Sequence, residues 1–132
     1  EKLDNQSKIQ NDNELKRILS EAIEINNYKI YIGKVNVNNS NDAKTIATRA
    51  IKDDKLDFVF LLANIETKTV LIGSRNEKSL EKIDVSNIVG EASKLYNGGA
   101  SKDPSLSIGG GPAQYDDTKC IDFVTKLLKK HI

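Results

Sequence analysis

The chain has 132 residues, of which 38% are hydrophobic and 30% charged, and its formal net charge is +1. This length suits one domain with one hydrophobic core, and no apolar run is long enough to span a bilayer. The balanced charge excludes a protein that binds nucleic acid through a uniformly basic surface, so a phosphate-binding surface, if any, is a local patch. A single cysteine indicates a reducing compartment, and we expect a cytoplasmic protein.

The chain contains one cysteine and one histidine, Cys120 and His131. This excludes an internal disulfide and a cysteine metal cluster, and it argues against a histidine-based triad. Cys120 falls in an apolar helix pattern typical of a small core residue. We therefore predict no catalytic residue, no metal and no cofactor. Two pairs of adjacent aspartates are interpreted as helix-terminus residues, because neighbours on a helix do not face each other: Asp53-Asp54 and Asp116-Asp117.

The N-terminal part of the chain has a helical pattern. Leu15, Ile18, Ala22 and Ile25 recur at three- and four-residue spacing, which predicts a helix over residues 8–26 that ends at Asn26-Asn27. The apolar seam covers barely two heptads, so packing on the domain or on a partner helix must complete it. We assign residues 1–27 to an N-terminal helix and residues 28–132 to the domain itself. The helix would serve either as a linker or as the contact of a homodimer.

The remaining elements alternate between strands and helices. Residues 28–37 alternate like a strand, and the apolar run at 58–63 is typical of a strand buried on both faces, followed by an antiparallel partner at 69–74. Helices are predicted over residues 42–53, capped by Asn41 or Asp42, over 85–96, capped by Asp84 or Ser86, and from Asp116 or Asp117 to the C-terminus. The predicted fold class is α/β, a single domain with a mixed central sheet covered by helices and preceded by the N-terminal helix.

The most unusual stretch is the glycine segment, residues 97–112, which holds five of the eight glycines and both prolines. Glycine clusters mark positive φ angles or close approaches of the backbone. Two interpretations stay open: a surface loop with two tight turns, or a backbone-lined binding loop. The spacing fits neither a P-loop nor a dinucleotide-binding turn. Leu106 and Ile108 predict a short strand inside the segment, and Lys94 lies just before it.

Three parts of this sequence resemble the C-terminal domain of alanyl-tRNA synthetase, a member of the wider group of DHH-associated domains. Phe58-Val59-Phe60-Leu61-Leu62-Ala63 and the strand that follows look like that family's paired central strands. The helix that runs into Asn97-Gly98-Gly99 is similar to its helix ending in a glycine pair. The short strand, closing glycines and last helix follow in the same order, and the likeness covers roughly residues 28–132.

The middle of the glycine segment departs from the family. In synthetases it typically runs Gly-Gly-Lys-Gly-Gly-Gly-Arg-Pro-Asp-x-Ala-Gln-Ala-Gly-Gly. Counted back from Gly109-Gly110, Lys102 stands at the arginine and Asp103-Pro104 at Pro-Asp. The internal glycine triplet is missing and the gap is two residues shorter. Lysine in place of arginine also loses the bidentate fork.

The resemblance implies a noncatalytic tRNA-binding domain that supports aminoacylation and editing, with tRNA(Ala) as the expected partner and no membrane. The parent protein would be an alanine–tRNA ligase or an alanyl-tRNA editing hydrolase. Backbone N–H groups and nearby lysines would contact RNA through its backbone and shape. The candidate nucleic-acid-binding residues lie in or beside the glycine segment: Lys94, Gly98, Gly99, Lys102, Gly109, Gly110 and Gly111.

Two alternatives remain. The domain could be the substrate-binding part of a DHH-type phosphoesterase acting on oligonucleotides or small phosphodiesters. Such domains carry a Gly-Gly-His motif, whereas Ala100 follows the glycine pair here. It could also be an interaction module whose helix over residues 8–26 pairs with a partner.

Overall fold

The structure is a computed structural model that describes residues 2–52, 56–65, 67–76, 78, 83–103, 106–112 and 115–130, with side chains from Asn11 onward. The helices and strands of these residues are α1 (Lys2–Glu21), β1 (Ile23–Ile25), β2 (Tyr28–Lys34), α2 (Ser40–Lys52), β3 (Phe58–Ile65), β4 (Lys68–Arg75), α3 (Val85–Lys94), β5 (Leu106–Gly111) and α4 (Asp117–Lys129).

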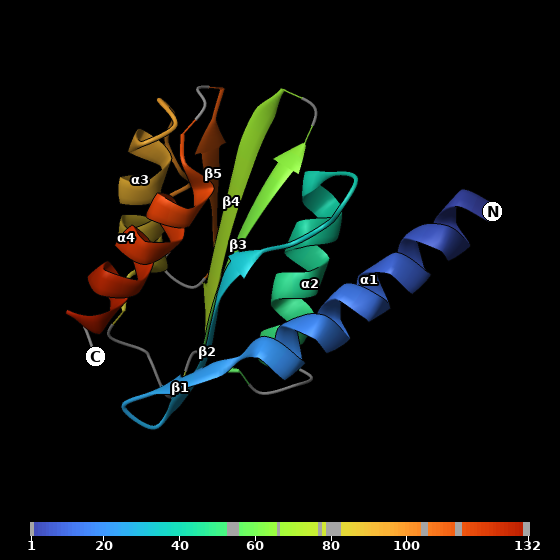
Figure 1. The fold of residues 1–132 in the computed structure, drawn as a ribbon, viewed down its shortest axis with the longest axis horizontal. Coiled ribbons are helices and arrows are strands. Elements are labelled where there is room, and N and C mark those ends of the chain that lie inside the picture. Colours follow the sequence, from blue (N-terminus) through green and yellow to red (C-terminus); the bar gives the residue numbers. More distant parts are fainter. Residues whose placement is uncertain are drawn as a thin grey trace.

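The five strands form one sheet in the order β1-β2-β3-β4-β5. The pair β2–β3 is parallel and joined by α2, whereas the other three pairs are antiparallel. Helices α1 and α2 cover one face of the sheet and α3 and α4 cover the other (Figure 1). The predicted α/β class with a mixed central sheet is confirmed.

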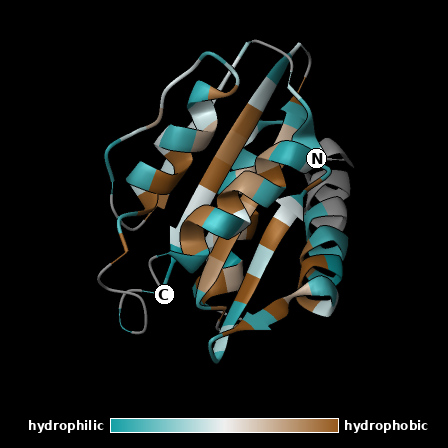
Figure 2. Ribbon diagram, turned by 60° about the vertical axis from the view of Figure 1, so that its left-hand side comes forward, coloured by the Kyte–Doolittle hydropathy of each residue, from teal (hydrophilic) through white to brown (hydrophobic). Residues whose placement is uncertain are grey.

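Strand β3 is the middle strand and separates two hydrophobic cores. Phe58, Phe60 and Leu62 pack toward α3 and α4, while Val59 and Leu61 pack toward α1 and α2. Each of these side chains is almost completely buried, and burial of one such side chain contributes about 1.5–3 kcal/mol. The apolar strands lie between helices whose outer faces are hydrophilic (Figure 2). The predicted doubly buried strand and its antiparallel partner β4 are confirmed.

The predicted end of the first helix is wrong. Helix α1 ends at Glu21, and Ile25 pairs with Tyr28 in an antiparallel hairpin between β1 and β2. The two residues between the strands, Asn26 and Asn27, have φ angles of 52° and 71°. Two successive left-handed residues are what a tight hairpin turn with the twist of a β-ribbon requires, and asparagine tolerates this conformation.

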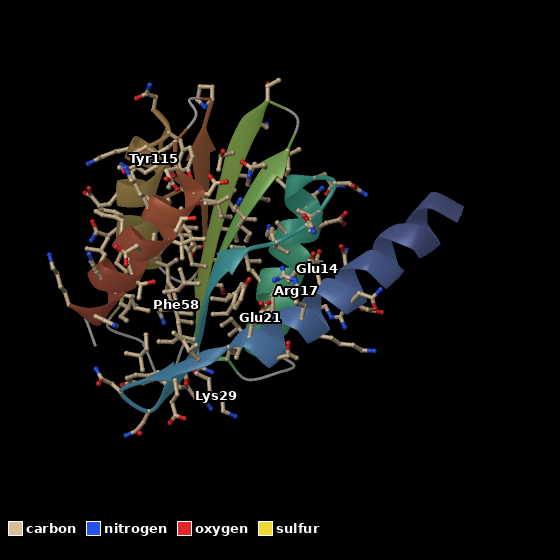
Figure 3. The ribbon with its side chains drawn as sticks, in the orientation of Figure 1. Glu14, Arg17, Glu21, Lys29, Phe58 and Tyr115 are labelled. Carbon is tan, nitrogen blue, oxygen red and sulfur yellow. The ribbon has the colours of Figure 1, made fainter. Side chains whose placement is uncertain are left out.

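The apolar seam of α1 is buried within the chain. Leu15 and Ile18 belong to the core between the sheet and α2. Arg17 ties α1 to the end of β2, because its Nη2 donates to the carbonyl oxygen of Lys34 at 2.8 Å. It also pairs with Glu14 and Glu21 (Figure 3). The N-terminal end of α1 extends away from the sheet (Figure 1).

Two of the three predicted helix N-caps are confirmed. Asp84 accepts from the N–H of Ser86, and Asp116 accepts from the N–H groups of the first turn of α4, as predicted. The predicted cap of α2 is wrong: the helix begins at Ser40, and Asn39 Oδ1 accepts from the N–H of Asp42 at 2.8 Å. Asp53-Asp54 and His131 lie outside the described residues. In the described part of the chain, each helix is too short or too polar to cross a membrane.

Candidate nucleic-acid interface

The glycine segment begins at the end of α3. Asn97 has a φ angle of 60°. Its N–H donates to the carbonyl oxygen of Lys94 at 3.1 Å, and the N–H of Gly98 donates to that of Ser93 at 3.0 Å. These two hydrogen bonds form a Schellman motif, which closes the C-terminal end of a helix. Asn97 occupies the left-handed position of this motif, which glycine usually takes. Gly98 is therefore needed for another reason.

After α3 the chain turns back along the outer edge of β5. The N–H of Ser101 donates to the carbonyl oxygen of Ile108 at 2.9 Å. Three N–H groups of β5 are bonded to side-chain oxygens outside the sheet: Leu106 to Asp103 at 3.3 Å, Ile108 to Ser101 at 3.1 Å and Gly110 to Ser93 at 2.8 Å. An edge strand normally presents such groups to solvent or to another chain. Here these N–H groups donate to side chains of the same protein.

Four of the predicted glycines have a packing role in this arrangement. A Cβ on Gly98 would overlap the carbonyl oxygen of Gly110, and one on Gly111 would lie 2.8 Å from the nitrogen of Gly98. A Cβ on Gly109 would lie 2.8 Å from that of Ala100. Gly110 has a φ angle of 121° and lies against Thr69 of β4. These glycines let the end of α3 and the returning chain pack directly on β5.

Gly99 is different, because a Cβ there would meet no atom within 4 Å. Within the described part of the chain, the N–H groups of Gly99, Ala100 and Lys102 donate no hydrogen bond. They lie on either side of Ser101, whose N–H points into the sheet edge. In the described part of the glycine segment, Gly99, Ala100 and Lys102 are therefore backbone donors available to a ligand.

The predicted lysines frame this edge. Lys102 is exposed on the returning chain. Lys94 lies in the last turn of α3 with its side chain 71% exposed, and its Nζ is 3.2 Å from Glu91 Oε1. The structure thus brings the five predicted glycines into one contact region, with Lys94 before the glycine pair and Lys102 between the pair and the glycine triplet. Their role toward RNA stays a prediction.

A polar network that the sequence analysis missed lies at the carboxyl ends of β2 and β3. Asp117, at the start of α4, accepts hydrogen bonds from the Tyr96 hydroxyl at 2.8 Å and from Asn64 Nδ2 at 2.9 Å. Lys34 Nζ lies 3.1 Å from Asp117 Oδ2, the oxygen that also accepts from Asn64. Burial alone would raise the pKa of Asp117. The donors from Asn64, Tyr96 and Lys34 outweigh it and hold that pKa below its ordinary value.

Two further side chains adjoin this network. The ring of Tyr115 packs edge to face on the ring of Tyr96, with centroids 5.7 Å apart. Cys120 is completely buried beside Tyr96. Burial raises the pKa of its thiol to about 11, which disfavours the reactive thiolate. The predicted core position of Cys120 is confirmed. The members of this network come from four elements far apart in sequence, and each alone carries no recognisable motif.

A cleft of about 920 Å³ lies at the opposite end of the sheet. Its described walls come from the end of α2, the start of β3, the end of β4 and the start of β5, and they combine three cationic with two acidic side chains: Lys52, Arg75 and Lys78 with Asp57 and Asp103. Among the described residues no group of three histidine, cysteine or acidic side chains is placed to hold a metal.

Comparisons with known proteins agree with the fold and with the sequence likeness. The chain is 31% identical over 114 residues to the alanine–tRNA ligase of Methanosarcina mazei and 32% identical over 114 residues to that of Methanosarcina acetivorans. Its fold matches the C-Ala domain of alanyl-tRNA synthetase from Aquifex aeolicus with a TM-score of 0.72 at 16% identity, covering 83% of this chain and 98% of that domain. The predicted resemblance to the C-terminal domain of alanyl-tRNA synthetase is confirmed.

The C-Ala fold is also found within larger proteins. An exopolyphosphatase-related protein from Bacteroides fragilis shares it with a TM-score of 0.56 at 12% identity, over 92% of this chain and 34% of that one. No family model matches the sequence. The match to each of the two Methanosarcina ligases covers 86% of this chain but only 12% of the ligase. The likeness therefore concerns this domain, and the activity of a whole ligase does not follow from it.

Proposed function

We propose that this chain is a noncatalytic tRNA-binding domain of an alanyl-tRNA synthetase-like protein, where it supports aminoacylation and editing. The observation that carries the proposal is the row of open backbone donors at Gly99, Ala100 and Lys102 on a C-Ala fold. Phosphate and ribose oxygens accept from such donors without regard to base sequence. The exposed side chain of Lys102 supplies the positive charge. We also propose a cytoplasmic location, because the proposed partner is tRNA.

The candidate residues then divide into two groups. Gly98, Gly109, Gly110 and Gly111 shape the edge by allowing the returning chain to pack on β5. Gly99 leaves room for a close approach from outside, and Lys102 and Lys94 provide the cations. Recognition of a folded RNA by shape and backbone fits this arrangement, because the segment offers N–H groups and ammonium groups in place of side chains that read base edges.

The test is a fluorescence anisotropy titration of labelled tRNA(Ala) with the chain at two salt concentrations. We expect binding that weakens with salt, and a Lys102→Gln variant whose log–log salt slope is shallower by about 0.7–0.9, the contribution of one phosphate contact. Lys44→Gln is the matched control, since Lys44 is exposed on α2 across the sheet. No binding at low salt would overturn the proposal, and so would binding that salt does not change. Competition by other tRNAs measures whether tRNA(Ala) is preferred.

We propose that a homodimer formed through α1 would use the part of the helix before Asn11 in place of the seam at Leu15 and Ile18. Leu15 and Ile18 are buried against the sheet and α2, so the seam that suggested a partner helix is already covered. Sedimentation of the chain with and without residues 1–10 tests this directly. A dimer that survives the truncation would place the contact elsewhere.

The alternative function is the substrate-binding domain of a DHH-type phosphoesterase. The fold shared with the exopolyphosphatase-related protein favours it, whereas Ala100 after the glycine pair argues against it. A short dinucleotide added to the tRNA titration separates the two. Competition by the dinucleotide at concentrations comparable to tRNA would favour the phosphoesterase-type domain.

A further inference from the structure

We propose that Tyr115 and Lys34 form a nucleotide subsite at the carboxyl ends of β2 and β3. The Tyr115 ring would stack on one unpaired base of the RNA, and Lys34 Nζ would bind a phosphate beside that base. This inference rests on the proposed function and specifies which kind of RNA element the domain takes. A planar π surface next to a cation is how proteins bind single-stranded nucleotides without reading their sequence.

The Tyr115 ring lies on the surface of the protein. It is 40% exposed and is one of two large apolar side chains on the surface of the described residues. Its hydroxyl makes no hydrogen bond to a described residue. In Figure 3 it lies near the upper ends of α3 and β5, on the far side of the sheet from the Glu14–Arg17–Glu21 cluster.

The Tyr115 ring is supported by the ring of Tyr96. Tyr96 is completely buried, and its ring meets that of Tyr115 at an interplanar angle of 73°. An edge-to-face contact occupies at most one face of the Tyr115 ring, so Tyr96 leaves at least one face uncovered. The hydroxyl of Tyr96 is fixed by Asp117. A fixed, exposed ring loses little entropy when a base stacks on it.

The same carboxylate positions the cation. Lys34 Nζ lies 3.1 Å from Asp117 Oδ2, while the side chain of Lys34 is 57% exposed. An ammonium group has three donors, so an ion pair with one carboxylate leaves donors for a phosphate oxygen. Asp117 therefore links the exposed ring, through Tyr96, to an exposed ammonium group.

The charges around the subsite limit it to one phosphate. Asp116 and Asp117 are both acidic, and Asp116 Oδ1 is engaged by the N–H groups of Thr118 and Lys119. Lys34 offsets Asp117, and Asp116 remains, so these three side chains leave no excess of positive charge. Binding here should then depend on stacking more than on charge, in contrast to binding at Lys102.

The test uses the full 132-residue chain and the same tRNA titration. Stacking of one base predicts that Tyr115→Leu weakens binding about 5- to 150-fold while leaving the salt slope unchanged. Tyr115→Phe keeps the ring and should bind within about twofold of the wild type. Ile23→Ala is the matched control, because Ile23 is the other exposed large apolar side chain and lies on β1. Urea unfolding of each variant verifies that the fold is intact.

The outcomes separate the two proposals. If wild-type chain binds tRNA and Tyr115→Leu binds equally well, the subsite is overturned and the tRNA-binding function stands. Equal losses in Tyr115→Phe and Tyr115→Leu would overturn it too, because the hydroxyl and not the ring would then matter. If wild-type chain binds no tRNA, the proposed function fails first and the subsite with it.

Discussion

Replacing Gly98 and Gly99 by alanine, one at a time, tests how the glycine segment is built. The two residues are adjacent and chemically identical, and neither has a φ angle in the left-handed region. A Cβ on Gly98 would overlap the carbonyl oxygen of Gly110 and lie 2.6 Å from its carbonyl carbon. A Cβ on Gly99 would meet no atom within 4 Å. The same substitution should therefore have opposite consequences at neighbouring positions.

The expected loss for Gly98→Ala follows from what must move. Relief of the overlap separates the end of α3 from β5, which disrupts the hydrogen bonds of Gly98 and Gly110 to Ser93. Each is worth about 1 kcal/mol, and overpacking adds about 1–3 kcal/mol. We expect the free energy of unfolding to fall by about 3–5 kcal/mol. At about 4 °C per kcal/mol for a domain of this size, the melting temperature falls by 12 °C or more.

For Gly99→Ala we expect a change within about 0.5 kcal/mol, or a gain of up to about 1 kcal/mol from lower entropy of the unfolded chain. Urea denaturation followed by circular dichroism measures both variants, and an unchanged m-value verifies that the comparison is valid. A Gly98→Ala variant within 1 kcal/mol of the wild type would refute the close packing of residues 98–103 on β5. If Gly99→Ala folds normally yet binds tRNA less well, the open side of the segment is the contact surface.

Three further predictions concern stability and reactivity. Gly90→Ala should stabilise the chain by about 0.5–1 kcal/mol in the same denaturation assay, because Gly90 lies inside α3 and a Cβ there meets no atom within 4 Å; a loss instead would mean an unrecognised contact. Asp117→Asn should cost about 1–2 kcal/mol at pH 7. Since the pKa of Asp117 is lowered in the folded state, this stabilisation is complete above about pH 4 and is lost as the pH falls further, so wild type and variant should converge in acid. A constant gap down to pH 2 would contradict the role given to the charge. Cys120 should react with a thiol reagent at pH 8 about 100-fold more slowly in the folded than in the urea-unfolded chain, since its folded pKa is about 11; equal rates would show that the thiol is accessible.

Local signals in the sequence predicted what local interactions decide. The run from Phe58 to Ala63 is typical of a strand buried on both faces. Asp84 and Asp116 cap helices through hydrogen bonds to residues two or three positions away. The end of α1 was missed because Ala22 and Ile25 continue its helical spacing. The deciding feature was the left-handed conformation of Asn26 and Asn27, which the pattern of apolar residues does not contain.

Long-range contacts set the limit of prediction at the candidate site. The sequence indicates that the glycines serve a close approach but not whether the approaching group is internal. Gly98 contacts Gly110, which is twelve positions away in the sequence. Four of the five glycines are therefore required by close contacts within the protein itself. The polar network around Asp117 forms only because the carboxyl ends of β2 and β3 lie beside the start of α4. Its other members are Lys34, Asn64 and Tyr96.

The charge distribution limits the kind of RNA binding that we propose for this domain. Lys34 and Lys94 are already paired with Asp117 and Glu91, so a phosphate at either lysine must share it with a carboxylate. Of these three lysines, only Lys102 forms no ion pair with a described residue, so it is the one most available to the proposed RNA ligand. With one such lysine and a net charge of +1, few counterions are released on binding. We therefore expect a salt slope near that of one or two phosphate contacts, with most of the affinity supplied by backbone donors and by stacking on Tyr115.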